Sequence, residues 1–162
     1  MADARYSLSA ILPEAYTRMR DLQQVSELAD LPRPLLELVK MRASQLNHCA
    51  YCLDMHAKDA MALGVAAEKL FVLEGWREAP FYSARERAAL AWTEALTLIA
   101  DRGVPDDLYR EAREQFSERE LACLTVAIVT INGWNRIAFS SRLEPGQYRS
   151  RFKPDAAGGS VV

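Results

Sequence analysis

Apolar residues recur along most of this chain with the spacing of an amphipathic helix. In the first such segment Leu12, Ala15, Met19, Leu22 and Val25 share one face. The same pattern continues almost to the C-terminus. It predicts helices at residues 12–28, 33–46, 49–64, 66–74, 83–101, 105–116 and 117–139 or beyond.

Capping signals in the sequence also indicate where several of these helices begin or end. Ser83 is followed by Glu86, and Ser117 by Glu120, which is the spacing of a capping box at a helix start. Gly64 suits the left-handed position that ends a helix. No segment alternates apolar and polar residues with β-branched enrichment, so we expect no strands and an all-α fold.

The last predicted helix is apolar on nearly all sides from Leu121 to Ile131. A helix of this kind is buried in a core or in a subunit interface, and one short chain would struggle to surround it. We therefore expect a homo-oligomer. Residues 1–149 are expected to form a single helical domain, and the small and polar residues at 150–162 a flexible tail.

Composition fits one globular domain, with 162 residues of which 50% are hydrophobic and 26% charged. A net charge of −2 gives no reason to expect nucleic acid or an anionic membrane as partner. Apolar runs such as Leu124–Ile131 are shorter than the ~20 residues that span a bilayer. The N-terminus lacks a signal sequence, and an odd count of three cysteines is unlike a secreted scaffold, so we expect a cytoplasmic protein.

Cys49, Cys52 and His56 are the residues that point to chemistry. On a helix these three side chains fall within roughly 60° of one another, so two thiols that can form a disulfide share a face with a base. Cysteines at a helix start have stabilised thiolates, and His56 can accept a thiol proton. After a thiolate attacks a peroxide, the other cysteine can close the disulfide.

Two other interpretations of the cysteine pair remain open. A Cys-x-x-Cys spacing supplies half of a tetrahedral zinc site, although His48 adjoins Cys49 and Cys123 lies in a helix that looks packed. The thiols can also be inert core residues, because free cysteine is commonly buried.

The run from Glu37 through Cys49 and Cys52 to His56 resembles the AhpD-like alkylhydroperoxidases of the carboxymuconolactone decarboxylase superfamily. In that family a glutamate precedes a Cys-x-x-Cys by about twelve residues and a histidine follows the second cysteine by four, as here. The segment Ile131-Asn132-Gly133-Trp134-Asn135-Arg136 is also similar. The likeness covers roughly residues 10–142.

The resemblance implies a compact all-α subunit in trimers or hexamers, with hexamers favoured. It implies reduction of alkyl hydroperoxides and hydrogen peroxide, with Cys52 attacking, Cys49 resolving, and His56 and Glu37 in a proton relay. Electrons come from a thioredoxin-like or lipoamide-linked reductant, and the redox-active Cys49–Cys52 disulfide serves in place of a metal or haem cofactor.

One position departs from the family, because Tyr51 stands where its best-known members carry a second histidine. A relay through that histidine cannot operate here, and we expect Tyr51 to pack. The polar cluster Asn132, Trp134, Asn135 and Arg136 must find partners, at a subunit interface or along the pocket. Alternative functions are a carboxymuconolactone decarboxylase-type reaction and a non-catalytic thiol redox sensor.

Overall fold

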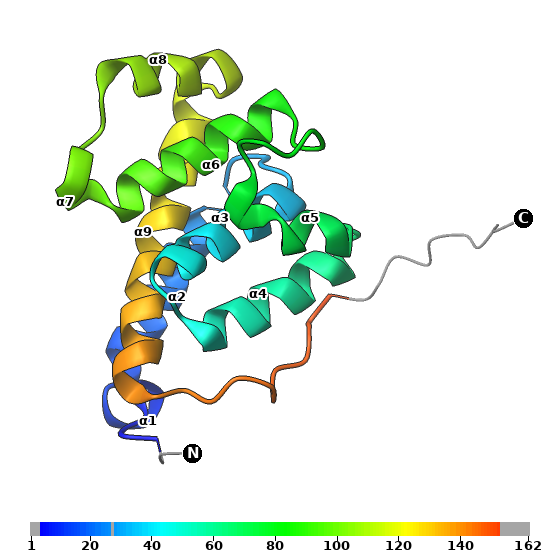
Figure 1. The fold of residues 1–162 in the computed structure, drawn as a ribbon. Coiled ribbons are helices and arrows are strands. Elements are labelled where there is room, and N and C mark those ends of the chain that lie inside the picture. The colour runs from blue at the N-terminus through cyan, green and yellow to red at the C-terminus, as the bar shows by residue number, and fades with distance from the viewer. Residues whose placement is uncertain (1–3, 27, 153–162) are drawn as a thin grey trace, which may run out of the picture.

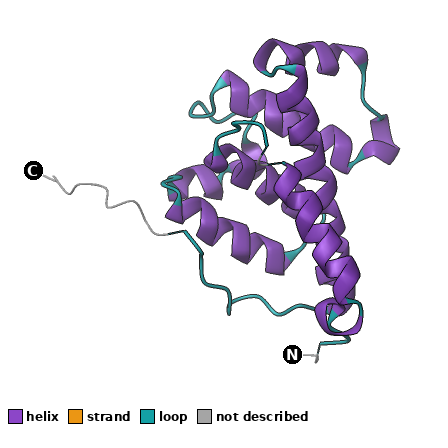
Figure 2. Ribbon diagram, turned by 180° about the vertical axis from the view of Figure 1, so that it is seen from behind, coloured by secondary structure: helices purple, strands orange, loops and turns teal. Residues whose placement is uncertain are grey.

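The structure is a computed structural model that describes residues 4–26 and 28–152. Within these residues the chain forms helices and loops and no β-strand, which confirms the expected all-α fold (Figure 2). In chain order the helices are α1 (Leu8–Ile11), α2 (Pro13–Val25), α3 (Arg33–Leu46), α4 (Ala50–Ala62), α5 (Ala67–Phe71), the 3-10 helix η1 (Leu73–Gly75), α6 (Ala84–Thr97), α7 (Ile99–Arg102), α8 (Asp106–Gln115) and α9 (Glu118–Ser141).

The predicted capping boxes are confirmed, but two segments predicted as single helices are each divided in the structure. Both capping boxes are present, at Ser83 and at Ser117. The segment expected as one helix at 12–28 is instead α1 and α2, because Pro13 disfavours helical geometry at Leu12, whose φ is −145°. The segment expected at 83–101 breaks at Leu98, between α6 and α7.

Helix α9 runs the length of the molecule and is its central packing element (Figure 1). It packs against α2, α3, α4, α6 and α8, and its Leu124 and Ile128 are fully buried among residues of α3 and α6. By length and composition alone α9 could cross a membrane. Its packing against five helices is that of the core helix of a globular domain.

Helix α3 is buried on all sides, because every residue from position 35 to position 44 is buried. This stretch includes the charged residues Glu37, Lys40 and Arg42, which must find partners inside the protein. Arg42 Nε donates to Glu94 Oε1 of α6 at 2.8 Å, while Glu37 and Lys40 face α4. The centre of the fold therefore contains a buried charge cluster beside the cysteine helix.

After α9 the chain turns back and runs along α4 (Figure 1). Lys58 Nζ donates to the carbonyl oxygens of Gly146 and Tyr148, at 3.3 and 3.2 Å. Of the tail expected at 150–162, residues 153–162 lie outside the described residues, and Ser150 Oγ donates to Asp59 at 2.6 Å. This segment forms part of the wall of the site described next.

Candidate active site

The two cysteines lie at the start of α4, where the chain reverses direction after α3. Cys49 is the N-cap residue, and Cys52 lies in the first turn. The Sγ atoms are 2.8 Å apart, both thiols are free, and both residues are buried. The structure thus brings the two sulfurs within bonding reach of each other at a helix entrance.

Local hydrogen bonds make this pair acidic. The hydrogen bond between the two sulfurs lowers the pKa of the Cys49 thiol to about 7, although burial acts in the opposite direction and raises it. Backbone N–H groups of Cys52 and Tyr51 and the Asn135 amide also stabilise the Cys49 thiolate. The pKa of Cys52 is raised, first by its hydrogen bond to Cys49 and then by burial. The pair therefore loses one proton readily and keeps the second.

A titration of the thiols tests this description. In a Cys123→Ser protein, which keeps only the pair, the ultraviolet thiolate absorbance should rise by one thiolate with a midpoint of about 7. The second thiolate should form only far above that pH. In a Cys49→Ser/Cys123→Ser protein the low midpoint should disappear, because Cys52 loses its partner. A midpoint at or above ~8.5 for the pair would contradict the assigned stabilisation.

His56 lies one turn beyond Cys52 and is held by α3. Its Nδ1 is 2.7 Å from Glu37 Oε2, and Lys40 Nζ donates to Glu37 Oε1 at 2.8 Å. Burial raises the pKa of Glu37, but the hydrogen bond with His56 and the charge of Lys40 have a larger combined effect and lower this pKa to about 2. The carboxylate is therefore ionised, so Nδ1 of His56 carries the proton that donates to it.

The other ring nitrogen of His56 is left free. Its Nε2 is buried and has no hydrogen-bond partner among the described residues. A buried nitrogen without a partner is uncommon in folded proteins and points to a role with a ligand or a transferred proton. His56 is thus fixed on one side by Glu37 and available for proton transfer on the other.

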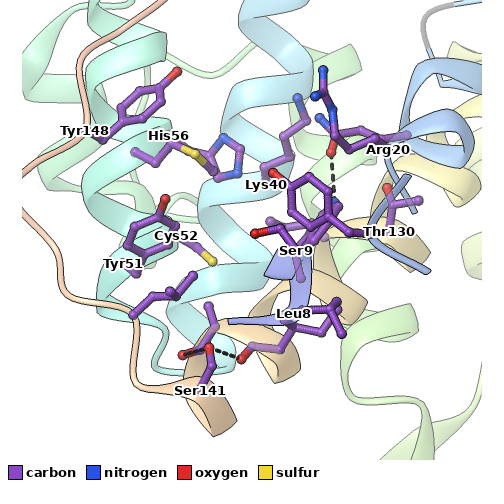
Figure 3. Close-up of a pocket in the computed structure, with 18 of the residues that line it drawn as sticks. Leu8, Ser9, Arg20, Lys40, Tyr51, Cys52, His56, Thr130, Ser141 and Tyr148 are labelled. Carbon is purple, nitrogen blue, oxygen red and sulfur yellow. Dashed lines mark hydrogen bonds between the residues drawn. The ribbon is translucent and has the colours of Figure 1, made fainter. Parts of the chain in front are cut away.

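A cavity of about 450 Å³ adjoins this arrangement, and Cys52 and His56 are both on its wall. Figure 3 shows the labelled side chains of α1, α3, α4 and α9 converging on it. The apolar part of the wall includes Ile131, Trp134 and Ile137 of α9. The cavity therefore offers a mainly apolar chamber of small-molecule size beside one reactive sulfur and one free imidazole nitrogen.

A third carboxylate lies close to Glu37 and His56. Tyr148 Oη donates to both oxygens of Asp59 at 3.0 Å, and burial together with this hydrogen bond raises the pKa of Tyr148 to about 12. Glu37, His56 and Asp59 could together offer ligand atoms to a metal ion. The oxygens of the two carboxylates already bond to Lys40, His56, Tyr148 and Ser150, so both carboxylates are satisfied by the protein itself.

For zinc, the cysteines lack further ligands in the part of the chain that the structure describes. The only cluster of three or more candidate ligands found there contains neither Cys49 nor Cys52. The pair therefore brings two of the four ligands that a structural zinc site takes.

The polar residues of α9 connect to the site in different ways. Asn135 is 1% exposed, contacts the thiol pair, donates to Ser44 Oγ at 3.0 Å and accepts from Asn47 at 2.9 Å. Trp134 lines the cavity and donates to Gln23 Oε1 at 2.8 Å. Arg136 is exposed and bonds within α9 to Asn132. The sequence signalled Asn135 only as a polar residue in an apolar helix.

Sequence reasoning did not single out Lys40, Asp59 or Tyr148. Lys40 follows Glu37 by three residues on one predicted helix, a spacing that would have indicated an ion pair. Asp59 had no distinguishing local pattern, and Tyr148 lies in a segment without helical periodicity. Tyr51 is half-buried and packs against the cluster that contains both cysteines. It therefore contributes packing, as expected, and it lines the cavity.

Comparison with known proteins gives consistent matches. Residues 13–95 match the model of the Carboxymuconolactone decarboxylase family. YdfG of Bacillus subtilis (strain 168), itself uncharacterised, is 40% identical over 136 residues, which are 84% of this chain and 92% of the relative.

Solved structures share the architecture. A protein of unknown function from Agrobacterium tumefaciens, likened in its description to the antioxidant defence protein AhpD, superposes with a TM-score of 0.85 and 37% identity over 90% of this chain and 100% of that one. A peroxidase-related protein with an AhpD core from Ralstonia eutropha JMP134 gives a TM-score of 0.76 over 86% and 74% of the two chains. At 17% identity, that second likeness concerns the fold alone.

Proposed function

We propose that this chain, which belongs to the carboxymuconolactone decarboxylase family and has the AhpD-like fold, is a thiol-dependent peroxidase for alkyl hydroperoxides and hydrogen peroxide. One observation carries the proposal. A pair of sulfurs 2.8 Å apart has one member, Cys52, on the wall of a cavity that also contains the unpaired Nε2 of His56. A nucleophile, a resolving thiol and a proton carrier are then in place around one chamber.

In the first step Cys52 attacks a peroxide oxygen. The proton retained by the pair moves to Cys49, 2.8 Å away, so that Cys52 carries the negative charge. A new S–O bond forms, the O–O bond breaks, and Cys52 becomes a sulfenic acid. The proton that the thiol pair loses is taken up by Nε2 of His56, the Glu37 carboxylate stabilises the resulting imidazolium, and the leaving alkoxide then takes this proton from Nε2.

In the second step Cys49 resolves the sulfenic acid. Its sulfur attacks Sγ of Cys52, the S–O bond breaks, and the hydroxide leaves as water with the Cys49 proton. The sulfurs have then given two electrons to the peroxide and share a disulfide. These two steps use only side chains of the protein and need no metal or haem.

The same proposal includes its cellular setting. A thioredoxin-like or lipoamide-linked dithiol returns the disulfide to the reduced state in the cytoplasm. The protein works as a homo-oligomer, a trimer or a hexamer. Large apolar side chains exposed on the single chain support this, with Ile11 68%, Leu28 63% and Phe71 82% exposed.

A peroxide assay tests the function. Reduced protein is mixed with cumene hydroperoxide or hydrogen peroxide in the presence of excess dithiol, and peroxide loss is followed over time. We expect many turnovers per chain, and the Cys123→Ser protein should match the wild type because Cys123 lies outside the cavity. Oxidation of one equivalent followed by arrest despite dithiol identifies a redox sensor, and absence of any thiol oxidation refutes peroxide chemistry.

A further inference from the structure

The two cysteines of the pair line different cavities. Cys52 lines the large cavity described above, whereas Cys49 lines a second cavity of about 360 Å³. The second cavity lies where the start of α4 meets the last turns of α9, at the end of the molecule shown lowest in Figure 1. Tyr51, Ala138 and Leu143 line both cavities and so form the wall between them. A disulfide between Cys49 and Cys52 would therefore be approachable from two sides.

The lining of the second cavity is basic. Arg5, His48 and Arg142 contribute to it, and no Asp or Glu does. All three are exposed, and the Arg142 guanidinium makes no hydrogen bond or ion pair with the rest of the described chain. The whole chain carries a net charge of −2, so the positive charge is a local feature of this cavity. It favours the binding of a negatively charged partner.

The backbone at this cavity is unusual. His48 and Arg142 have φ of 54° and 57°, and they are the non-glycine residues with positive φ in the described part of the chain. Bulky residues seldom adopt this conformation, and such residues gather at functional sites. Here one precedes α4 and the other follows α9, so both define the rim beside Cys49.

We propose that reducing equivalents enter through this second cavity, where a dithiol on a negatively charged carrier attacks Sγ of Cys49. The inference rests on the proposed function, because it assigns the return half of the same redox cycle. The peroxide and the reductant then use different cavities beside the pair. Neither has to leave for the other to approach, and the exposed Phe139 and Leu143 offer apolar contact beside the arginines.

The exchange balances as two thiol–disulfide steps. A thiolate of the carrier bonds to Sγ of Cys49, the Cys49–Cys52 bond breaks, and Cys52 leaves as a thiolate. The second carrier thiolate then attacks the carrier sulfur of the mixed disulfide, so the carrier closes its own disulfide and Cys49 leaves. Two electrons pass to the protein, and the two protons of the dithiol become available to the two protein sulfurs.

Cys52 becomes a better leaving group once Cys49 is bonded to the carrier, although its burial still raises its pKa. Its ionisation in the reduced pair is opposed first by the interaction with Cys49, and that interaction is absent once Cys49 is bonded to the carrier. The Asn135 amide remains and stabilises the departing thiolate. Cys49 is meanwhile the cysteine that lines the cavity on the reductant side.

The attacked sulfur can be identified chemically. Cys123→Ser protein is oxidised to the disulfide with diamide, treated with the monothiol mercaptoacetate, and quenched with N-ethylmaleimide. Peptide mass spectrometry should find the mercaptoacetate adduct on Cys49 and the maleimide on Cys52. The reverse pattern would overturn the proposal. Because diamide replaces peroxide, the outcome is independent of whether the protein is a peroxidase.

The role of the positive charge has its own test. Dihydrolipoate and dihydrolipoamide carry the same dithiol and differ in one negative charge, so their ratio of reduction rates reports charge alone. Arg142→Asn, in which asparagine tolerates the left-handed backbone, should lower the dihydrolipoate-to-dihydrolipoamide ratio about fivefold. Arg110→Asn removes the same charge from α8, away from both cavities, and should leave the ratio unchanged. Equal ratios in both variants would refute an anionic carrier at this surface.

Discussion

We expect Cys52→Ser to lower the rate of peroxide consumption at least about 1000-fold, which is the scale expected when a covalent nucleophile is removed. The reason is geometric, since Cys52 is the cysteine on the wall of the large cavity with His56. Cys49→Ser has a different phenotype. Its Cys52 still attacks, but the sulfenic acid cannot be resolved, so about one equivalent of peroxide is consumed before turnover stops.

Stopped-flow measurement with each variant in a Cys123→Ser background separates these roles. A sulfenic-acid probe should label Cys49→Ser after peroxide treatment and should not label Cys52→Ser. Circular dichroism checks that the single-atom change from sulfur to oxygen leaves the helices intact. If Cys52→Ser consumes peroxide as fast as the parent protein, the assignment of the nucleophile is wrong.

Glu37→Gln should damage both stability and catalysis. The substitution leaves the buried ammonium of Lys40 without a counter-charge. The free energy of unfolding should therefore fall by about 3–5 kcal/mol, the cost of removing one partner of a buried pair. In catalysis, the amide of glutamine donates to Nδ1 of His56 where the carboxylate accepted. That favours the tautomer with its proton on Nε2, so peroxide turnover should fall about 100-fold or more.

The pH dependence of unfolding gives a second readout of the same residue. The pKa of Glu37 is lowered in the fold to about 2 from an ordinary value of 4.5. Its stabilising contribution, about 3 kcal/mol, is therefore complete above pH 4.5 and is lost as the pH falls toward 2. Urea unfolding at a series of pH values should show this loss in the wild type and a flatter profile in Glu37→Gln.

A double variant separates the two effects. Glu37→Gln/Lys40→Met removes the stranded ammonium and should recover much of the lost stability, because a neutral buried side chain needs no partner. It should not recover peroxide turnover, since His56 still lacks its carboxylate. Recovery of turnover together with stability would show that Glu37 acts through folding alone and not through His56.

Local sequence patterns anticipated much of the fold. Helix α3 begins and ends where periodicity placed it, at Arg33 and Leu46, and Gly64 has the positive φ of 84° expected after α4. Breaks inside longer apolar segments were not anticipated, as at Leu98. Periodicity averages over several turns, whereas a break depends on how the next segment packs.

The sequence by itself determined the helices, their capping boxes and the shared face of Cys49, Cys52 and His56, because these follow from spacings of three and four residues along one chain. The family likeness added Glu37. Tertiary structure alone decided the contacts between helices: that carboxylate on His56, Asn135 against the thiols, and the different cavities that the two cysteines line. Such contacts join residues far apart in sequence, and local periodicity states which face is buried without stating what it meets.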